Sequence, residues 1–147
     1  MRNILGLASI GLVLVTAAPA FADDSVAGTY KVKFEQVSTN CSSPVSYPEF
    51  DDLKIQVKGG DVQVDIERTP IMVGKAGKPG KLNVKSKLGH TPIAGMDGTF
   101  SLAGRISPEG MISLVMVGEY TASGKPLCTQ SWNLSGQRGG GDGKAKK

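Results

Sequence analysis

An alternating stretch between Gly98 and Gly136 constrains the fold more than any other part of the chain. Apolar and polar residues alternate along three segments, which are separated by the turn sequences Pro108–Gly110 and Ser123–Lys125. Alternation of this kind between turn residues is typical of antiparallel strands. The stretch therefore predicts a three-stranded antiparallel meander. It indicates no particular chemistry by itself.

The meander also predicts its own register. We take Pro108–Gly110 as a three-residue loop, with Gly110 in the left-handed conformation that such loops need. The apolar face then pairs Ile106 with Ile112, Gly104 with Leu114, Leu102 with Met116, and Phe100 with Gly118. A bulky partner on the next strand covers a glycine that would otherwise weaken its own strand. A second three-residue loop, Ser123–Lys125, pairs Leu114 with Leu134 and Met116 with Trp132, and keeps Cys128 on the same face.

A second hairpin is predicted within Leu53–Glu67, around Gly59-Gly60, which we expect to form a type I′ turn. One register gives apolar pairs on one face and lysine–aspartate pairs on the other. These pairs are Val57–Val62, Ile55–Val64 and Leu53–Ile66, with Lys58–Asp61 and Lys54–Asp65 on the opposite face. A slip of one residue would destroy both sets, so the pattern determines the register.

Further strands are predicted at Gly28–Val37 and Leu82–Leu88, with a short edge strand at Ile71–Val73. Two long loops, Ser38–Phe50 and Gly74–Gly80, separate these strands, and no stretch shows helical periodicity. We therefore expect an all-β domain. It is a small antiparallel barrel or sandwich of seven or eight strands that ends in the three-stranded meander.

The two ends of the chain differ from its body. Residues 1–22 combine Arg2, an apolar run and the small-residue site Ala20–Ala22, which favours a cleaved signal peptide over an uncleaved anchor. Residues 23–137 form the single β domain, and the glycine- and lysine-rich residues 138–147 are expected to be a disordered basic tail. These features predict a secreted or periplasmic protein with no transmembrane segment after cleavage.

The basic charge of the chain belongs to its ends. The formal net charge is +4, of which Arg2 supplies one unit and the tail supplies three. The body is therefore electrically neutral, whereas a nucleic-acid-binding domain is expected to be basic in its body. We expect no nucleic-acid partner.

Two cysteines, Cys41 and Cys128, remain after signal cleavage. An exported protein with two cysteines is expected to pair them in a disulfide bond. The alternatives are a free thiol or a metal pair, and two cysteines without nearby histidines make a poor metal site. We expect no metal and no cofactor.

The sequence offers no catalytic constellation. His90 is the only histidine, and its Gly-His-Thr-Pro setting is typical of a solvated loop side chain. The carboxylates of the Leu53–Glu67 hairpin are expected to pair with lysines on a wet face and not to form an acid–base pair. We expect the protein not to be an enzyme.

Four residues are candidates for lining a ligand site: Tyr30, Tyr120, Gln130 and Trp132. All four are placed on the inner face, where a closed barrel would make them the walls of a cavity. In a packed sandwich they would be ordinary core residues. A buried Gln130 amide needs hydrogen-bond partners in either case.

Lys75, Lys78 and Lys81 lie in a glycine-rich run without an acidic residue and are candidates for binding an anion. The run lacks the spacing of a nucleotide-binding P-loop. Either it is simply a soluble loop, or it binds an anionic partner such as a lipid head group or an acidic glycan.

Gly28-Thr29-Tyr30 at the start of the first strand, together with the closing meander, resembles the small secreted barrels of the lipocalin and avidin kind. The tryptophan expected after Gly-Thr is a tyrosine here, and the resemblance assigns no functional residues. Two functions remain. The first is a non-catalytic binding or inhibitor module that presents loops and strand edges to a macromolecule. The alternative is a carrier that holds a small hydrophobic ligand inside the barrel. The length of the loops favours the first.

Overall fold

The computed structural model describes residues 26–75 and 80–139, so the predicted signal peptide and most of the predicted tail lie outside the described residues. Nine strands make up the domain: β1 (Gly28–Thr39), β2 (Phe50–Lys58), β3 (Asp61–Ile66), β4 (Met72–Lys75), β5 (Lys81–Ser86), β6 (Gly89–His90), β7 (Asp97–Ile106), β8 (Met111–Ala122) and β9 (Lys125–Arg138). The prediction of an all-β fold is confirmed.

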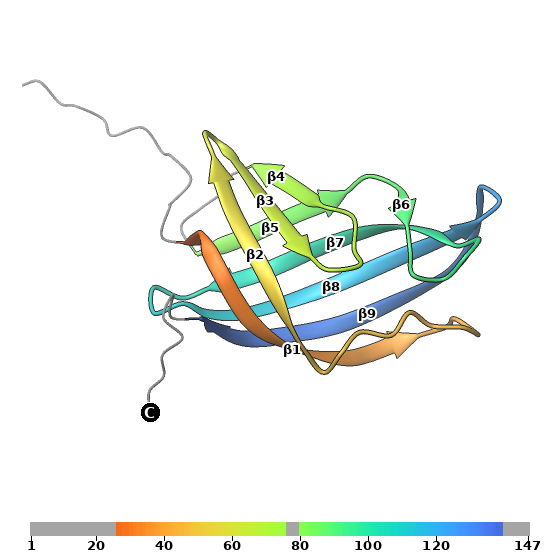
Figure 1. Cartoon of the computed structure of the whole chain (residues 1–147), viewed down its shortest axis with the longest axis horizontal. Helices are drawn as coiled ribbons and strands as arrows, with labels where there is room; N and C mark the ends of the chain where they lie inside the picture. Colours follow the sequence, from red (N-terminus) through yellow and green to blue (C-terminus); the bar gives the residue numbers. More distant parts are fainter. Residues whose placement is uncertain (1–25, 76–79, 140–147) are drawn as a thin grey trace, which may run out of the picture.

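The strands close into a ring. Each long strand pairs antiparallel with its neighbour in sequence, β5 pairs with β7, and β9 returns to pair with β1. The two-residue strand β6 adds only to one end of β7. In Figure 1, β2 and β3 cross steeply in front of β7, β8 and β9, as tilted strands do on opposite walls of a barrel. The small antiparallel barrel is thus an up-and-down barrel whose last three long strands form the predicted meander.

Both predicted registers are confirmed along their lengths. The meander pairs Gly104 with Leu114 and Phe100 with Gly118, and the third strand pairs Met116 with Trp132. The first hairpin pairs Leu53 with Ile66 and continues in register to Lys58 and Asp61. In both places the apolar pattern alone was sufficient, because a one-residue slip would turn the core face outward.

Two predicted turns are wrong. In the Gly59-Gly60 turn only Gly59 has a positive φ (61°), which is the pattern of a type II′ turn and not of a type I′ turn. The β8–β9 turn is the two-residue Ser123-Gly124 and not Ser123–Lys125, and both of its residues have positive φ (51° and 77°). A bulge at Leu127 absorbs the extra residue, so the pairing beyond it keeps the predicted register.

The short strand β4 is not an edge strand. It pairs with β3 on one side and with β5 on the other, so it lies inside the closed ring and not at an edge. β4 therefore includes the first two residues of the predicted loop Gly74–Gly80, and residues 76–79 lie outside the described residues.

Glycines make room for the large aromatic side chains of the core. Phe100 and Tyr120 meet edge to face, with ring centroids 5.8 Å apart. A Cβ atom on Gly98 or on Gly118 would approach atoms of the Tyr120 side chain to 2.8 Å. The two glycines therefore serve packing, which agrees with the predicted covering of Gly118 by Phe100.

The barrel extends one residue further than predicted. Arg138, which we assigned to the tail, is the last residue of β9 and donates a 2.8 Å hydrogen bond to the Tyr30 hydroxyl. Its guanidinium carbon lies 5.3 Å from the centre of the Tyr30 ring, which is a cation–π distance. The amide of Gly139 then donates to the carbonyl of Thr29 at 2.8 Å. Among the described residues, no helix has the length and apolar character needed to cross a membrane.

Candidate functional site

The segment between β1 and β2, residues 40–49, packs into one end of the barrel. We call it the mouth segment. In Figure 1 it runs back from the tip of β1 towards the start of β2, at the end of the barrel that lies away from the β7–β8 turn. The backbone amide of Asn40 donates to the carbonyl of Thr129 at 3.2 Å, and the Asn40 side chain accepts from the amide of Thr129 at 2.8 Å. These bonds tie the start of the mouth segment to β9.

A disulfide bond is the second attachment. Cys41 is bonded to Cys128, with Cα atoms 5.1 Å apart, as predicted. The bond joins positions separated by 87 residues in sequence, so it removes a large amount of conformational freedom from the unfolded chain. Disulfides of this kind are typical of oxidising compartments.

The third attachment is the buried amide of Gln130, which is 1% exposed. Its Oε1 accepts hydrogen bonds from the amide of Val45 at 3.1 Å and from the hydroxyl of Tyr120 at 3.0 Å. Its Nε2 donates to the carbonyl of Val45 at 2.9 Å and to the side-chain oxygen of Gln36. Gln130 thus holds both backbone polar groups of Val45, as a neighbouring strand would. Burial raises the pKa of Tyr120, which keeps the donating hydroxyl neutral.

The fourth attachment is the side chain of Tyr47. Its ring stacks on Phe34 with centroids 5.1 Å apart and meets Trp132 edge-on at 5.2 Å. Its hydroxyl shares a 2.6 Å hydrogen bond with the hydroxyl of Thr69 in the β3–β4 connection. Burial also raises the pKa of Tyr47. The mouth segment therefore bridges β1, β9 and the β3–β4 turn.

The four predicted lining residues are all buried, but they do not form one site. Tyr120, Gln130 and Trp132 gather around the mouth segment, whereas Tyr30 contacts Arg138. These three residues surround two side chains of the mouth segment, Val45 and Tyr47, and not an empty cavity. Neither Val45 nor Tyr47 was predicted to be part of a site. Their spacing of two positions within a loop was the one sequence feature that could have indicated that this segment packs against the barrel as a strand does.

A shallow hollow of about 350 Å³ lies beside the mouth segment, between it, the β6–β7 loop and the β8–β9 turn. Its wall combines Ser42 and Ser43 with the apolar side chains of Ile93, Met96 and Leu127. No charged residue is among the described residues that line it. We call it the mouth hollow.

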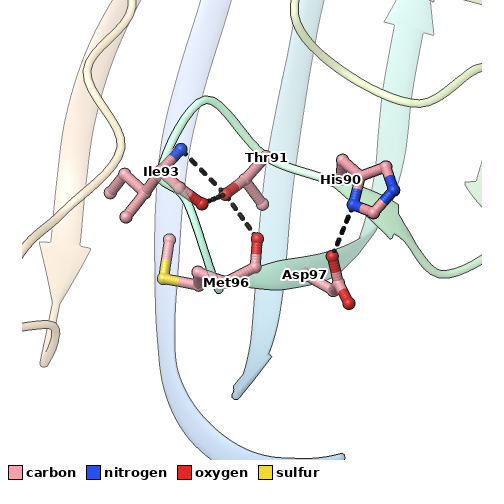
Figure 2. Close-up of polar contacts among 5 residues, drawn as sticks. All are labelled: His90, Thr91, Ile93, Met96 and Asp97. Carbon is pink, nitrogen blue, oxygen red and sulfur yellow. Dashed lines mark hydrogen bonds and ion pairs between the residues drawn. The ribbon is translucent and has the colours of Figure 1, made fainter. Parts of the chain in front are cut away.

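The β6–β7 loop that forms one wall of the mouth hollow is internally hydrogen-bonded (Figure 2). The Thr91 hydroxyl donates to the carbonyl of Met96 at 2.7 Å and accepts from the amide of Ile93 at 3.1 Å. Next to it, Nδ1 of His90 lies 2.9 Å from a carboxylate oxygen of Asp97. The His90 side chain is 98% exposed, as expected for a solvated loop residue. No group of three or more His, Cys, Asp or Glu among the described residues is placed to hold a metal ion.

The three candidate anion-binding lysines do not act as one group. The Lys75 ammonium pairs with the Asp61 carboxylate at 2.7 Å, and this hydrogen bond raises the pKa of Lys75. Asp61 thus pairs with a β4 lysine in addition to facing Lys58 across β2 and β3. Lys78 lies outside the described residues. Lys81 is on β5, at the barrel end opposite the mouth segment, where its cross-strand partner is Arg105.

Comparison with known proteins gives no relative from which a function could be transferred: no protein family, no curated protein and no solved structure matches the chain.

Proposed function

We propose that this is an exported, non-catalytic binding module that recognises a macromolecular partner through the mouth segment and the adjacent mouth hollow. The observation that carries the proposal is that the mouth segment, although exposed, is held to the barrel at both of its ends and in its middle. Ser43, Pro44 and Ser46 are exposed, while Val45 between them is 2% exposed and is held by Gln130. A loop that is rigid before binding loses little conformational entropy when it binds.

The composition of the surface supports a protein or glycan partner. The mouth hollow offers serine hydroxyls and an asparagine amide beside apolar side chains, and Leu127 is 54% exposed. Polar groups around an apolar centre are typical of specific interfaces. The ordered β6–β7 loop supplies a second preformed wall.

Recognition through strand edges, which we considered from the sequence, has no support in the ring. Each long strand has a neighbouring strand on both sides over part of its length, so none of the long strands in the described residues is an open edge along its whole length. The proposal is therefore restricted to loops. The disulfide supports export, because such bonds are typical of oxidising compartments.

The packed interior favours this proposal over the carrier alternative. A carrier of the lipocalin kind needs an open space within the barrel, whereas Val45 and Tyr47 insert from the mouth against Phe34, Gln130 and Trp132. At this end of the barrel, the protein's own mouth segment occupies the place where a ligand would enter.

Site-specific photo-crosslinking tests the proposal. A photoreactive amino acid is placed at Ser46 in the mouth segment or at Gln56, which is exposed on the outer face of β2. Each protein is incubated with the extracellular fraction of its own host and illuminated. We expect a discrete cross-linked product from Ser46 and none from Gln56.

Competition decides whether such a product is specific. Unlabelled wild-type protein should abolish the Ser46 product, and a Ser43→Arg variant of the competitor should fail to do so because it adds a charge beside the uncharged mouth hollow. Equal products from both positions, no product at all, or undiminished competition by the Ser43→Arg protein would each contradict the proposal.

A further inference from the structure

A second and larger hollow lies at the opposite end of the barrel, beneath the β7–β8 turn. Its volume is about 730 Å³, within the range typical of small-molecule sites. The wall includes the apolar residues Ile106, Pro108, Met111 and Ile112 and the two cations Lys81 and Arg105. We call it the basal pocket.

The two cations are direct cross-strand partners. Lys81 on β5 faces Arg105 on β7, and both side chains are exposed. Like charges directly opposite each other destabilise a sheet. Within residues 26–75 and 80–139 neither side chain has an ion pair with a carboxylate, and no acidic residue lines the pocket. An anion between the two cations would remove this repulsion.

Hydroxyl groups continue the same row across the barrel wall. Arg105 is the cross-strand partner of Ser113, and Ser113 is the partner of Ser135. Both serines line the pocket. The row thus presents two cations followed by two neutral donors, which is the donor set that carboxylate and phosphate oxygens accept.

The apolar part of the pocket is held in place by the turn itself. Ser107 donates its amide to the carbonyl of Met111 at 2.8 Å, and its hydroxyl accepts from the Met111 amide at 3.0 Å. The carbonyl of Gly110 accepts from the amide of Arg138 at 2.8 Å, which ties the turn to the end of β9. Met111 is 48% exposed beside the nearly buried Ile106 and Ile112. The pocket therefore has a fixed apolar surface next to its cations.

We propose that the basal pocket binds a single-chain amphiphile with an anionic head group, either a carboxylate or a phosphate. The head group lies between Lys81 and Arg105, and the start of the alkyl chain lies against Pro108 and Met111, the exposed apolar residues of the wall. The pocket is separate from the mouth segment, so this binding is independent of the proposed macromolecular partner. Of the lysines that the sequence singled out, only Lys81 takes part. Its partner Arg105 was not foreseen, because only closure between β5 and β7 brings the two together.

Isothermal titration calorimetry of the mature protein tests the proposal with decanoate, decyl phosphate, decanol and inorganic phosphate, all below micelle-forming concentrations. We expect the two anionic amphiphiles to bind, and decanol and inorganic phosphate to bind at least about tenfold more weakly. A separate titration with anionic lipid vesicles tests whether the protein binds a bilayer surface in place of a monomeric amphiphile.

Two double variants with the same change in charge identify the site. Lys81→Gln/Arg105→Gln should weaken decanoate binding about tenfold, as expected for two partly exposed charge contacts. Lys54→Gln/Lys58→Gln on the outer face of β2 should change it less than about twofold. Met111→Gln should weaken binding of both anionic amphiphiles while leaving the preference for anions intact.

Folding of each variant is checked by its urea midpoint. Without ligand, the Lys81→Gln/Arg105→Gln protein should be at least as stable as the wild type, since it loses a repulsion. The proposal is overturned if decanol binds as well as decanoate, if inorganic phosphate alone binds as tightly, or if the β2 double variant loses as much affinity. Binding to vesicles without binding to monomers, or binding to neither, would also overturn it.

Discussion

Replacing Gln130 with leucine tests whether one buried amide holds the mouth segment in the barrel. Leucine has a similar size but leaves three buried polar groups without their partner: the amide and the carbonyl of Val45 and the hydroxyl of Tyr120. Each such group costs about 1–3 kcal/mol, and burial of the leucine side chain returns about 2 kcal/mol. We expect a net loss of about 1–7 kcal/mol, a large share of the stability of a small domain.

Urea denaturation monitored by tryptophan fluorescence measures this loss. Trp132 is the only tryptophan of the chain, it is 3% exposed, and it contacts Tyr47 of the mouth segment. Gln130→Leu should therefore lower the urea midpoint and also increase quenching of native-state Trp132 by acrylamide, because release of Val45 loosens the segment around Tyr47. An unchanged midpoint together with unchanged quenching would refute the reasoning.

Two further variants serve as controls. Gln56→Leu makes the same substitution on the exposed outer face of β2 and should shift stability by less than about 0.5 kcal/mol. Gln130→Glu keeps one acceptor oxygen but replaces the donating amide nitrogen with a second oxygen, which donates a hydrogen bond only when the carboxyl is protonated. Burial raises the pKa of such a carboxyl in the folded state above its unfolded value of about 4.3. The Gln130→Glu protein should therefore be closest to wild type below about pH 4 and should lose stability as the pH rises through the raised pKa.

Four other variants test the packing, the disulfide and the alkaline stability. Gly104→Val and Gly118→Val should each lose about 1–3 kcal/mol in thermal melts, since a Cβ there would meet Leu114 or Tyr120 atoms at 2.8 Å; melting at or above the wild-type temperature would contradict this. A Cys41→Ser/Cys128→Ser protein should lose at most about 4–5 kcal/mol in urea, and no loss would mean that hydrogen bonds alone fix the mouth segment. Because burial raises the pKa of Tyr120, stability should be retained below about pH 10 and fall above it, and Tyr120→Phe should reduce the slope of that fall.

Much of the barrel could be predicted from the alternation of apolar and polar residues. The pairs Gly104–Leu114 and Leu53–Ile66 follow from the pattern because a strand has a side-chain period of two, and only one register buries every apolar residue. The turn at Ser123-Gly124 was not predictable in this way, because a bulge at Leu127 compensates for the shorter loop and leaves the pattern of the strands unchanged.

The candidate sites depended on the tertiary structure. The sequence placed Gln130 inside and required it to have partners, but it did not indicate that Val45 and Tyr120 would be two of them. It singled out Lys81 without Arg105, which is distant along the chain and lies opposite Lys81 only because β5 and β7 complete the ring. The sequence alone thus determined the long strands, the registers of the meander and of the first hairpin, and the cysteines available for pairing, since these follow from local patterns and from composition. Only the tertiary structure decided which side chains meet across the closed ring, because contacts between distant segments depend on the path of the whole chain.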